Sequence, residues 1–316
     1  MAQVSIATWL IVPALVISAV GILIWKKLHP SYVKVGTISR LFFHPVKSLK
    51  AIEVKSGKCT KIGLEVNGVL ERSFLLVDKK GCKLYVNEVP TMILLTPRID
   101  RKTLVISTPS GEELKVKIKH EISAEDKIID ICIEGKVISA VDCGDEAANF
   151  LQSFLKVSYV RLVRYFPPSP EVAFPDFAPY HILSQASIDD VNSKLDGEQI
   201  SVLNFRPNIV AENCTAFAED TWKCIKFPEG VELNNFIMTT RCVYTTNNPS
   251  TGVITLKEPI NTLRKYRIPN DQTIFKKCER YKPCVGIYCG CIKLGKISVG
   301  DDIYAQVGDR PEMIVK

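Results

Sequence analysis

Residues 103–118 read TLVISTPSGEELKVKI, and this stretch has the pattern of a β-hairpin. Apolar and β-branched residues stand on both sides of a Pro-Ser-Gly turn, a combination that favours two paired strands. The same plan occurs upstream in residues 73–86, SFLLVDKKGCKLYV, around a Lys-Lys-Gly turn. Residues 36–46, GTISRLFFHPV, mix β-branched and aromatic residues before a proline. The first half of the chain is therefore predicted to consist mainly of strands.

Two segments have the periodicity of helices. Residues 145–155, DEAANFLQSFL, place four apolar side chains on one helical face: Ala148, Leu151, Phe154 and Leu155. Residues 183–197, LSQASIDDVNSKLDG, are predicted to form a helix that begins at Ser184 or Ser187 as N-cap and stops at Gly197.

Short strand-like runs return after the second helix, at residues 208–212, 235–246, 252–256, 287–294 and 297–307. Because strands dominate and helices are few, we predict a mainly-β fold with a few helices (α+β), arranged as a pair of β barrels or sheets. Residues 165–179, which hold five prolines, are predicted to be an irregular linker or an active-site loop.

The N-terminal segment, residues 4–25, carries no charge and has the length of a bilayer-spanning helix. Trp9 and Trp25 stand near its two ends, and Lys26-Lys27 follow at once. We predict a retained membrane anchor with the C-terminal bulk on the cytosolic side, rather than a cleaved signal peptide or a buried core helix. These features suit the endoplasmic reticulum or the outer mitochondrial membrane equally.

The composition restricts the classes of protein to which the chain can belong. Its 316 residues carry 41 basic and 34 acidic side chains, a net charge of +7, which suggests an anionic partner or membrane surface more than nucleic-acid binding. Eleven cysteines without a regular spacing argue against a secreted disulfide scaffold. With four histidines and no phosphate-binding glycine loop or nucleophile elbow, the common hydrolase and nucleotide-binding classes are not indicated.

Two loops carry side chains suited to anions. FHPVKSLK at 43–50 offers the Lys47 ammonium and the Ser48 hydroxyl at a turn, although a solvated loop explains it equally simply. NFRPNIV at 204–210 concentrates planar donors: Arg206 could bind a phosphate and Asn208 the edge of a heterocycle. The alternative for this second loop is a cap for strand-end carbonyls.

Two groups of cysteines could bind metal. A guanidinium beside a thiol favours the thiolate that soft metals bind, so Cys242 next to Arg241 is a candidate ligand, with an inert core cysteine as the alternative. The tail cluster of Cys278, Cys284, Cys289 and Cys291 could form a zinc site. Its spacing is unusual for zinc, and Cys289 and Cys291 on one strand would point to the same face.

Taken in order, six stretches resemble the mitochondrial amidoxime-reducing components, a family of MOSC-domain molybdenum proteins. The resemblance runs from about Val35 to the C-terminus. The stretches are GTISRLFFHPVKSLKAIEV, GLEVNGVLERSFLLVD, DFAPYHILSQASIDDVNSKL, NFRPNIVAE, RCVYTTNNPSTGVITLKEPINTLRKYR and ISVGDDIYA. It implies an N-terminal anchor at residues 1–30, a β-rich MOSC N-terminal domain at 31–155 and a MOSC β-barrel domain at 156–316.

The resemblance also implies a site that binds a pyranopterin molybdenum cofactor (Mo-molybdopterin). Cys242 matches the metal-ligating position, and Asp176 matches an acidic residue at the reacting face. Phe177 and Ala178 replace hydroxyl residues, which leaves backbone contacts there, and Asn87 stands where relatives usually place arginine. The remaining cofactor-binding positions are Lys47, Ser48, Arg72, Arg206, Asn208, Thr240 and Arg241.

The implied activity is the reduction of N-hydroxylated compounds, such as amidoximes and hydroxylamines, to the N–H form plus water. The resemblance implies electrons from a b-type haem cytochrome and its NADH-dependent reductase, on the outer mitochondrial membrane. Two alternatives stay open: a non-catalytic cofactor carrier or sulfur-transfer MOSC protein, and a membrane-tethered scaffold whose tail cysteines bind zinc.

Overall fold

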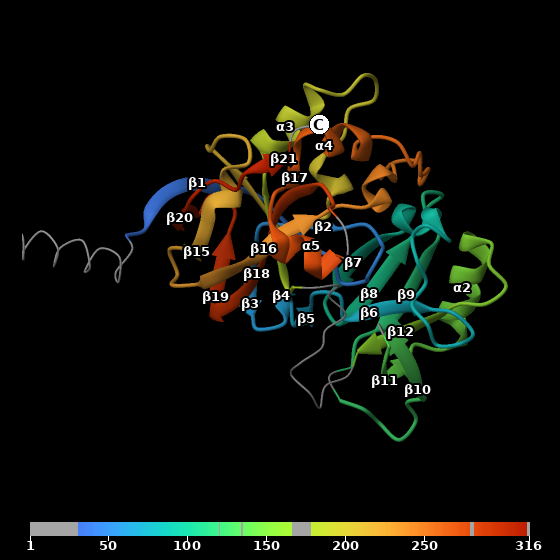
Figure 1. The fold of residues 1–316 in the computed structure, drawn as a ribbon. Coiled ribbons are helices and arrows are strands. Elements are labelled where there is room, and N and C mark those ends of the chain that lie inside the picture. The colour runs from blue at the N-terminus through green and yellow to red at the C-terminus, as the bar shows by residue number, and fades with distance from the viewer. Residues whose placement is uncertain (1–30, 120, 134, 166–177, 279–280, 315–316) are drawn as a thin grey trace, which may run out of the picture.

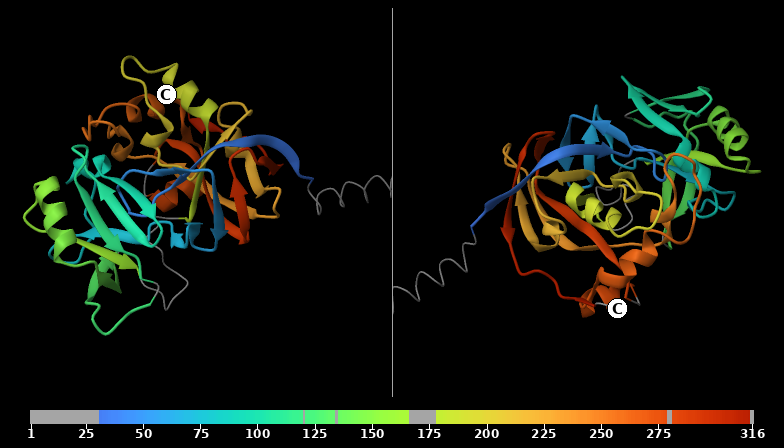
Figure 2. Two further views of the ribbon diagram at one scale, coloured as in Figure 1. Left: turned by 180° about the vertical axis from the view of Figure 1, so that it is seen from behind. Right: turned by 90° about the horizontal axis from the view of Figure 1, so that it is seen from above.

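The structure is a computed structural model that describes residues 31–119, 121–133, 135–165, 178–278 and 281–314. Strands make up most of its regular secondary structure, so the prediction of a mainly-β fold with few helices is confirmed. Figures 1 and 2 show a barrel on one side of the molecule and smaller sheets with one helix on the other. Among the described residues, no helix is both long and apolar enough to cross a bilayer. The predicted anchor, residues 4–25, lies outside the described residues.

A seven-stranded barrel forms the larger unit. Its neighbours around the ring are β1 (Val33–Phe43), β14 (Ile209–Glu212), β13 (Tyr180–Ser184), β18 (Cys284–Lys293), β16 (Glu232–Thr240), β15 (Trp222–Lys226) and β20 (Asp302–Val307). The pairing of β1 with both β14 and β20 closes the ring, and β2 (Ile52–Val54) extends β1. A strand from the N-terminal end of the described chain therefore completes a barrel built from residues after 180.

A four-stranded sheet lies beside the barrel, in the order β10 (Ile128–Ile133), β11 (Lys136–Asp142), β12 (Arg161–Tyr165) and β6 (Phe74–Val77). The three-stranded sheet of β7 (Thr96–Asp100), β8 (Thr103–Ser107) and β9 (Glu113–Lys117) contains the hairpin predicted at 103–118. A third sheet again joins distant parts of the chain: β19 (Gly295–Ser298), β3 (Ser56–Thr60), β4 (Gly63–Val66) and β5 (Val69–Leu70). The C-terminal β17 (Ile268–Pro269) and β21 (Met313–Ile314) pair with one another.

The two predicted helices are present, but the second is shorter than predicted. Helix α2 spans Asp145–Leu155, and buries Ala147 along with three of the four predicted core residues. Helix α3 spans Gln185–Asn192, with the Ser184 hydroxyl accepting a hydrogen bond from the Ser187 amide as N-cap. It ends before Gly197 because the Asn192 amide side chain binds both backbone groups of Ile200 and turns the chain. Helices α4 (Ile260–Tyr266) and α5 (Gln272–Cys278) follow.

Four predicted strands differ from the structure, and the last of them, residues 297–307, is divided between β19 and β20, which belong to different sheets. The run 83–86 does not continue as the second strand of a regular hairpin after β6; only an isolated bridge joins Val77 to Lys83. Residues 252–256 likewise form a single bridge, between Asn247 and Ile254. β16 ends at Thr240, and a 3-10 turn, η4 (Val243–Thr246), follows. In the first and third cases the chain leaves the sheet where it meets the cavity described next.

Candidate active site

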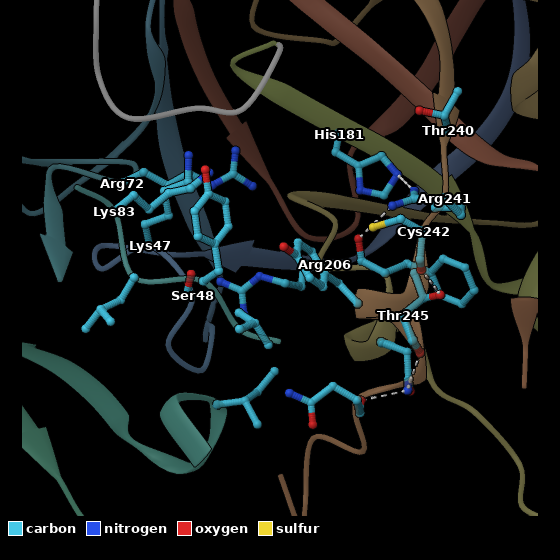
Figure 3. Close-up of a pocket in the computed structure, with 18 of the residues that line it drawn as sticks. Lys47, Ser48, Arg72, Lys83, His181, Arg206, Thr240, Arg241, Cys242 and Thr245 are labelled. Carbon is cyan, nitrogen blue, oxygen red and sulfur yellow. Dashed lines mark hydrogen bonds between the residues drawn. The ribbon is translucent and has the colours of Figure 1, made fainter. Parts of the chain in front are cut away.

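Most of the cofactor-binding candidates from the sequence line one cavity between the barrel and the residues that precede helix α2. About 1010 Å³ of atom-free space, partly open to solvent, separates two walls. Figure 3 shows Cys242, Arg241 and His181 on one side and Lys47, Ser48, Arg72 and Lys83 on the other. We call these groups the barrel wall and the N-terminal wall.

The Cys242 thiol stands at the point where a barrel strand gives way to a turn. Thr240 ends β16, and Cys242 is the N-cap residue of η4. Its carbonyl accepts hydrogen bonds from the Thr245 amide at 3.1 Å and the Thr245 hydroxyl at 2.9 Å, which fix the backbone at this position. The side chain is exposed and lines the cavity. An exposed thiol in a cavity is not the inert core cysteine that the sequence left as an alternative.

Arg241 is the buried cation of the barrel wall. Its Nε donates to the Val285 carbonyl at 3.0 Å, and Nη1 donates to the Phe205 carbonyl at 3.2 Å. Nη2 donates to His181 Nε2 as well as to the Val285 carbonyl. Burial lowers the pKa of Arg241 to about 10, so the guanidinium stays charged at neutral pH. These bonds hold a fixed positive charge directly beside the thiol.

His181, on β13, was not singled out from the sequence. It is fully buried, and burial together with the Arg241 charge holds its pKa well below the usual value. The ring is therefore neutral at neutral pH, and its Nε2 can accept the Arg241 hydrogen bond. The ring also packs edge-on against Tyr288, with centroids 5.7 Å apart. The sequence around His181 gives no signal of a functional role. Its contact with Arg241 in the folded structure is what identifies it as part of the site.

The N-terminal wall is built from residues in an unusual backbone conformation. Ser48 and Arg72 have φ values of 74° and 51°, in the left-handed region that non-glycine residues seldom occupy. Backbone hydrogen bonds enforce this geometry: Lys47 N donates to Phe74 O at 2.9 Å, and Arg72 N donates to His44 O at 2.7 Å. Backbone conformations that are unfavourable by themselves, but are enforced by the surrounding structure, are common at ligand-binding sites.

A buried histidine–carboxylate pair supports Arg72 from behind. Both oxygens of Glu71 accept hydrogen bonds from His44, from its amide at 2.9 Å and across 3.0 Å to its ring Nδ1. The Arg72 Nε lies 3.6 Å from the same carboxylate. Burial lowers the pKa of His44 to about 4, although Glu71 opposes this. Hence the neutral His44 imidazole and the Glu71 carboxylate hold one side of Arg72, and its other side faces the cavity.

Arg206 connects the two walls. It follows a 3-10 turn, η2 (Val202–Asn204), and has a left-handed backbone with φ of 54°. Its Nη1 donates to the Leu49 carbonyl at 2.6 Å, across a sequence separation of 157 residues. Tyr244 makes a second link, since its hydroxyl donates to Asn87 Oδ1 at 3.0 Å at the rim. Asn87 is the residue that stands where the family resemblance implies an arginine.

The cavity wall carries a one-sided charge. Among the described residues, its lining includes five cationic side chains and no carboxylate; the cations are Lys47, Arg72, Lys83, Arg206 and Arg241. Such a surface favours a ligand with more than one negative charge, because each cation can make a charge-assisted hydrogen bond. An exposed thiol within the same wall adds a ligand suited to a soft metal.

Not every residue singled out from the sequence reaches the cavity. Asn208 is fully buried: its Oδ1 accepts from His181 N at 3.1 Å and its Nδ2 donates to Phe42 O at 3.3 Å. Its amide ties β1 to β13 instead of facing a ligand. Ala178 is buried and absent from the lining, whereas Thr240 is part of it. Asp176 and Phe177 lie outside the described residues.

Three of the four cysteines of the C-terminal tail occupy the core, and the Cys278 side chain lies outside the described part of the structure. Cys284, Cys289 and Cys291 lie on β18 and are buried. Cys289 and Cys291 belong to the same core cluster, as expected for alternate positions of one strand, while Cys284 packs against Met238 and Ile274. Burial raises the pKa of the Cys289 and Cys291 thiols. Within the described ranges, no group of three or more His, Cys, Asp or Glu side chains is placed to hold a metal ion.

Comparison with known proteins identifies relatives over most of the chain. The family model of the MOSC N-terminal beta barrel domain matches residues 35–158, and that of the MOSC domain matches 169–304. Mitochondrial amidoxime reducing component 2 of Rattus norvegicus is 34% identical, covering 95% of this chain and 94% of the relative. Mitochondrial amidoxime reducing component 2 of Homo sapiens is 32% identical, covering 95% of this chain and 94% of the relative. Mitochondrial amidoxime-reducing component 1 of Homo sapiens is 33% identical, covering 94% of this chain and 93% of the relative.

Proposed function

Since the chain belongs to the family of mitochondrial amidoxime-reducing components, we propose that it is a molybdenum-cofactor-dependent reductase of N-hydroxylated compounds. Its reaction would convert amidoximes and hydroxylamines to the N–H form plus water. The observation that carries the proposal is the cavity in which an exposed cysteine thiol stands among five cations without a carboxylate in the described lining.

The donor set of this cavity fits the cofactor that the family implies. A pyranopterin cofactor carries a phosphate, which suits the cationic lining, and a molybdenum centre, which suits a thiolate. Cys242 would hold the metal, with the fixed positive charge of Arg241 beside it. Lys47, Arg72 and Arg206 would hold the phosphate, and the Ser48 hydroxyl and Thr240 would add contacts to the polar rings.

When bound, the cofactor would supply the two electrons that reduction of the N–O bond requires. The protein's contribution is to position the cofactor and substrate and to provide protons. Asp176 is proposed to orient the N-hydroxyl group or to relay a proton when the N–O bond breaks. In an Asp176→Ala variant that keeps its molybdenum, turnover should fall steeply. Unchanged turnover would exclude the relay and leave Asp176 as a turn residue.

Electrons are proposed to come from a b-type haem cytochrome and its NADH-dependent reductase. Acidic faces of such cytochromes suit a chain with a net charge of +7. Residues 1–30 are proposed to anchor the protein in the outer mitochondrial membrane, with the endoplasmic reticulum as the alternative and the catalytic part facing the cytosol. Encounters of this kind are weak and weaken further with salt. A turnover rate insensitive to ionic strength would therefore contradict this docking.

Reconstitution tests the activity directly. The full chain, purified with molybdenum and combined with a b-type cytochrome, its reductase and NADH, should convert an aromatic amidoxime to the amidine. NADH oxidation should match product formation. A cofactor carrier or sulfur-transfer protein is the alternative, because MOSC domains also serve such roles. A preparation that contains molybdenum and accepts electrons, yet forms no amidine, would favour the carrier over the reductase.

A further inference from the structure

The two edges of the four-stranded sheet beside the barrel, β6 and β10, are joined by the segment that follows β6. We call the contact between this segment and β10 the seam. After β6 the chain turns tightly and returns, with Leu84 N donating to Leu76 O at 3.0 Å. The returning segment then meets β10, the opposite edge of the sheet, through a parallel bridge between Cys82 and Cys132. A backbone hydrogen bond supports this seam, with Cys132 N donating to Gly81 O at 2.9 Å. Two cysteines thus face one another where the sheet closes.

The geometry of this pair suits a disulfide. Residues bridged between neighbouring strands have backbones about 5 Å apart, within the range of about 4.4–6.8 Å between Cα atoms that a disulfide spans. The side chains of directly paired residues also lie on the same face. In the structure the two thiols are free and partly exposed.

The backbone around the pair is held firmly, so a new bond would require little movement. Asp78 Oδ1 accepts from both Lys80 N and Cys82 N at 2.8 Å and fixes the turn. A Cβ added to Gly81 would lie 2.8 Å from the Asp130 carbonyl, which shows how closely the turn approaches β10. Gly81 also has φ of +73°, a conformation suited to glycine.

We propose that Cys82 and Cys132 are a redox-modification site that forms a reversible disulfide by exchange with a small-molecule disulfide such as glutathione disulfide. One thiolate attacks the glutathione disulfide, forms a mixed disulfide and releases one glutathione. The second thiolate then attacks the protein sulfur of the mixed disulfide and releases the other glutathione. The two protein thiols are oxidised together by two electrons, and the glutathione disulfide is reduced to two thiols.

Two measurable properties follow from the structure. Burial, the Asp78 carboxylate and Cys132 raise the pKa of Cys82, so the disulfide should form faster as the pH rises above neutral. The bond would close the seam covalently, which should raise the unfolding temperature by about 4–10 °C. It would also restrain Lys83, the next residue, which lines the cavity.

Peptide mapping of the full chain after incubation with glutathione disulfide tests the proposal. We expect a peptide pair cross-linked through Cys82 and Cys132, reversed by dithiothreitol. In Cys82→Ser or Cys132→Ser, the remaining cysteine of the pair should instead carry glutathione. The matched control is Cys224→Ser, which removes a partly exposed thiol on β15 whose Sγ contacts Asn234 Oδ1 at 3.6 Å, and should leave the cross-link intact.

Phenylarsine oxide provides a second measurement, because trivalent arsenic bridges two thiols that lie side by side. The wild-type chain should bind it through this pair and the two serine variants should not. If peptide mapping instead finds separate glutathione adducts on Cys82 and Cys132 and no cross-link, the proposal is overturned. It would equally be overturned if the arsenical bridged neither residue.

Discussion

The two walls of the cavity hold their functional groups by different means. On the barrel wall, Arg241 and His181 are buried and fixed by hydrogen bonds to each other and to backbone carbonyls. On the N-terminal wall, Ser48 and Arg72 are fixed by a left-handed backbone that neighbouring strands enforce. The barrel wall therefore suits a ligand atom that has to sit at one position. The N-terminal wall presents cations, Lys47 and Arg72, that are also buried but whose positions depend on this backbone conformation.

The comparison also shows that neither half of the chain contains the site alone. Arg206 crosses from the barrel to the Leu49 carbonyl, and Tyr244 reaches Asn87. β1 completes the barrel next to β14 and β20. Separating the halves would thus remove both the barrel closure and one wall of the cavity. The variants below alter one wall at a time.

Replacing Cys242 by serine should have the largest effect, because it removes the proposed metal ligand from the barrel wall. Mutation of a residue that hydrogen-bonds to a metal ligand lowers metal affinity or activity by about 10–100-fold. Loss of the ligand itself should therefore lower the rate of amidoxime reduction by at least about 100-fold. Steady-state kinetics measure this. Cys224→Ser, which removes a thiol remote from the cavity lining, should retain full activity. Equal activity of the two variants would exclude Cys242 as a ligand.

Replacing Arg72 by alanine should weaken the N-terminal wall. A charge-assisted hydrogen bond contributes about 1.5–3 kcal/mol, so cofactor retention should weaken by roughly 10–100-fold. Molybdenum per chain after extensive dialysis is the measurement. The control is Arg40→Ala, whose guanidinium pairs with Glu53 at the surface and should not affect retention. If both variants kept the same molybdenum content, Arg72 would not contact the cofactor.

Replacing His44 by glutamine should change how stability depends on pH. The folded pKa of His44, about 4, lies below its unfolded value of about 6.5, so the unfolded chain binds the proton first. Its contribution is complete above pH 6.5 and is lost as the pH falls towards 4, by about 3 kcal/mol. Urea unfolding at pH 7 and pH 4 should show a smaller loss in the variant. His181 contributes with the same sign, so some dependence should persist. Identical losses would contradict the buried neutral state of His44.

Replacing Ser48 by glycine should have the smallest effect. Its φ of 74° suits glycine, so the free energy of unfolding should rise by up to about 1 kcal/mol. Ser48→Ala removes the same hydroxyl without relieving the backbone and should not gain stability. Chemical denaturation of both variants separates the backbone effect from the loss of the hydroxyl. A glycine variant less stable than the alanine variant would argue against strain at this position.

Local sequence patterns predict many of the strands and helix α2, but not how the chain closes the barrel. The hairpin at 103–118 and helix 145–155 are encoded by neighbouring residues, and both occur in the structure. The pairing of β1 with β14, in contrast, joins Thr37 to Glu212. No local pattern specifies a contact over that distance. The same reason explains why β1, assigned by sequence to the N-terminal part, belongs to the barrel.

The site shows the same division. Lys47, Arg206, Arg241 and Cys242 could be singled out because charged residues and a thiol stand in recognisable loops. His181 could not, because its neutral state arises from burial beside Arg241. Asn208 was chosen for the right chemistry, yet the fold uses both ends of its amide to tie strands together. Side-chain type thus predicted donors, whereas only packing decides which donors face the cavity.

The most direct measurement of the central claim is X-ray absorption at the molybdenum edge of the purified full chain. Wild-type protein should show the dithiolene sulfurs of the cofactor and one further sulfur from Cys242. In Cys242→Ser, the molybdenum that is retained should have one sulfur neighbour fewer, while Cys224→Ser should match the wild type. The same sulfur count in wild type and Cys242→Ser would contradict the assignment of Cys242 as the ligand and, with it, the proposed active site.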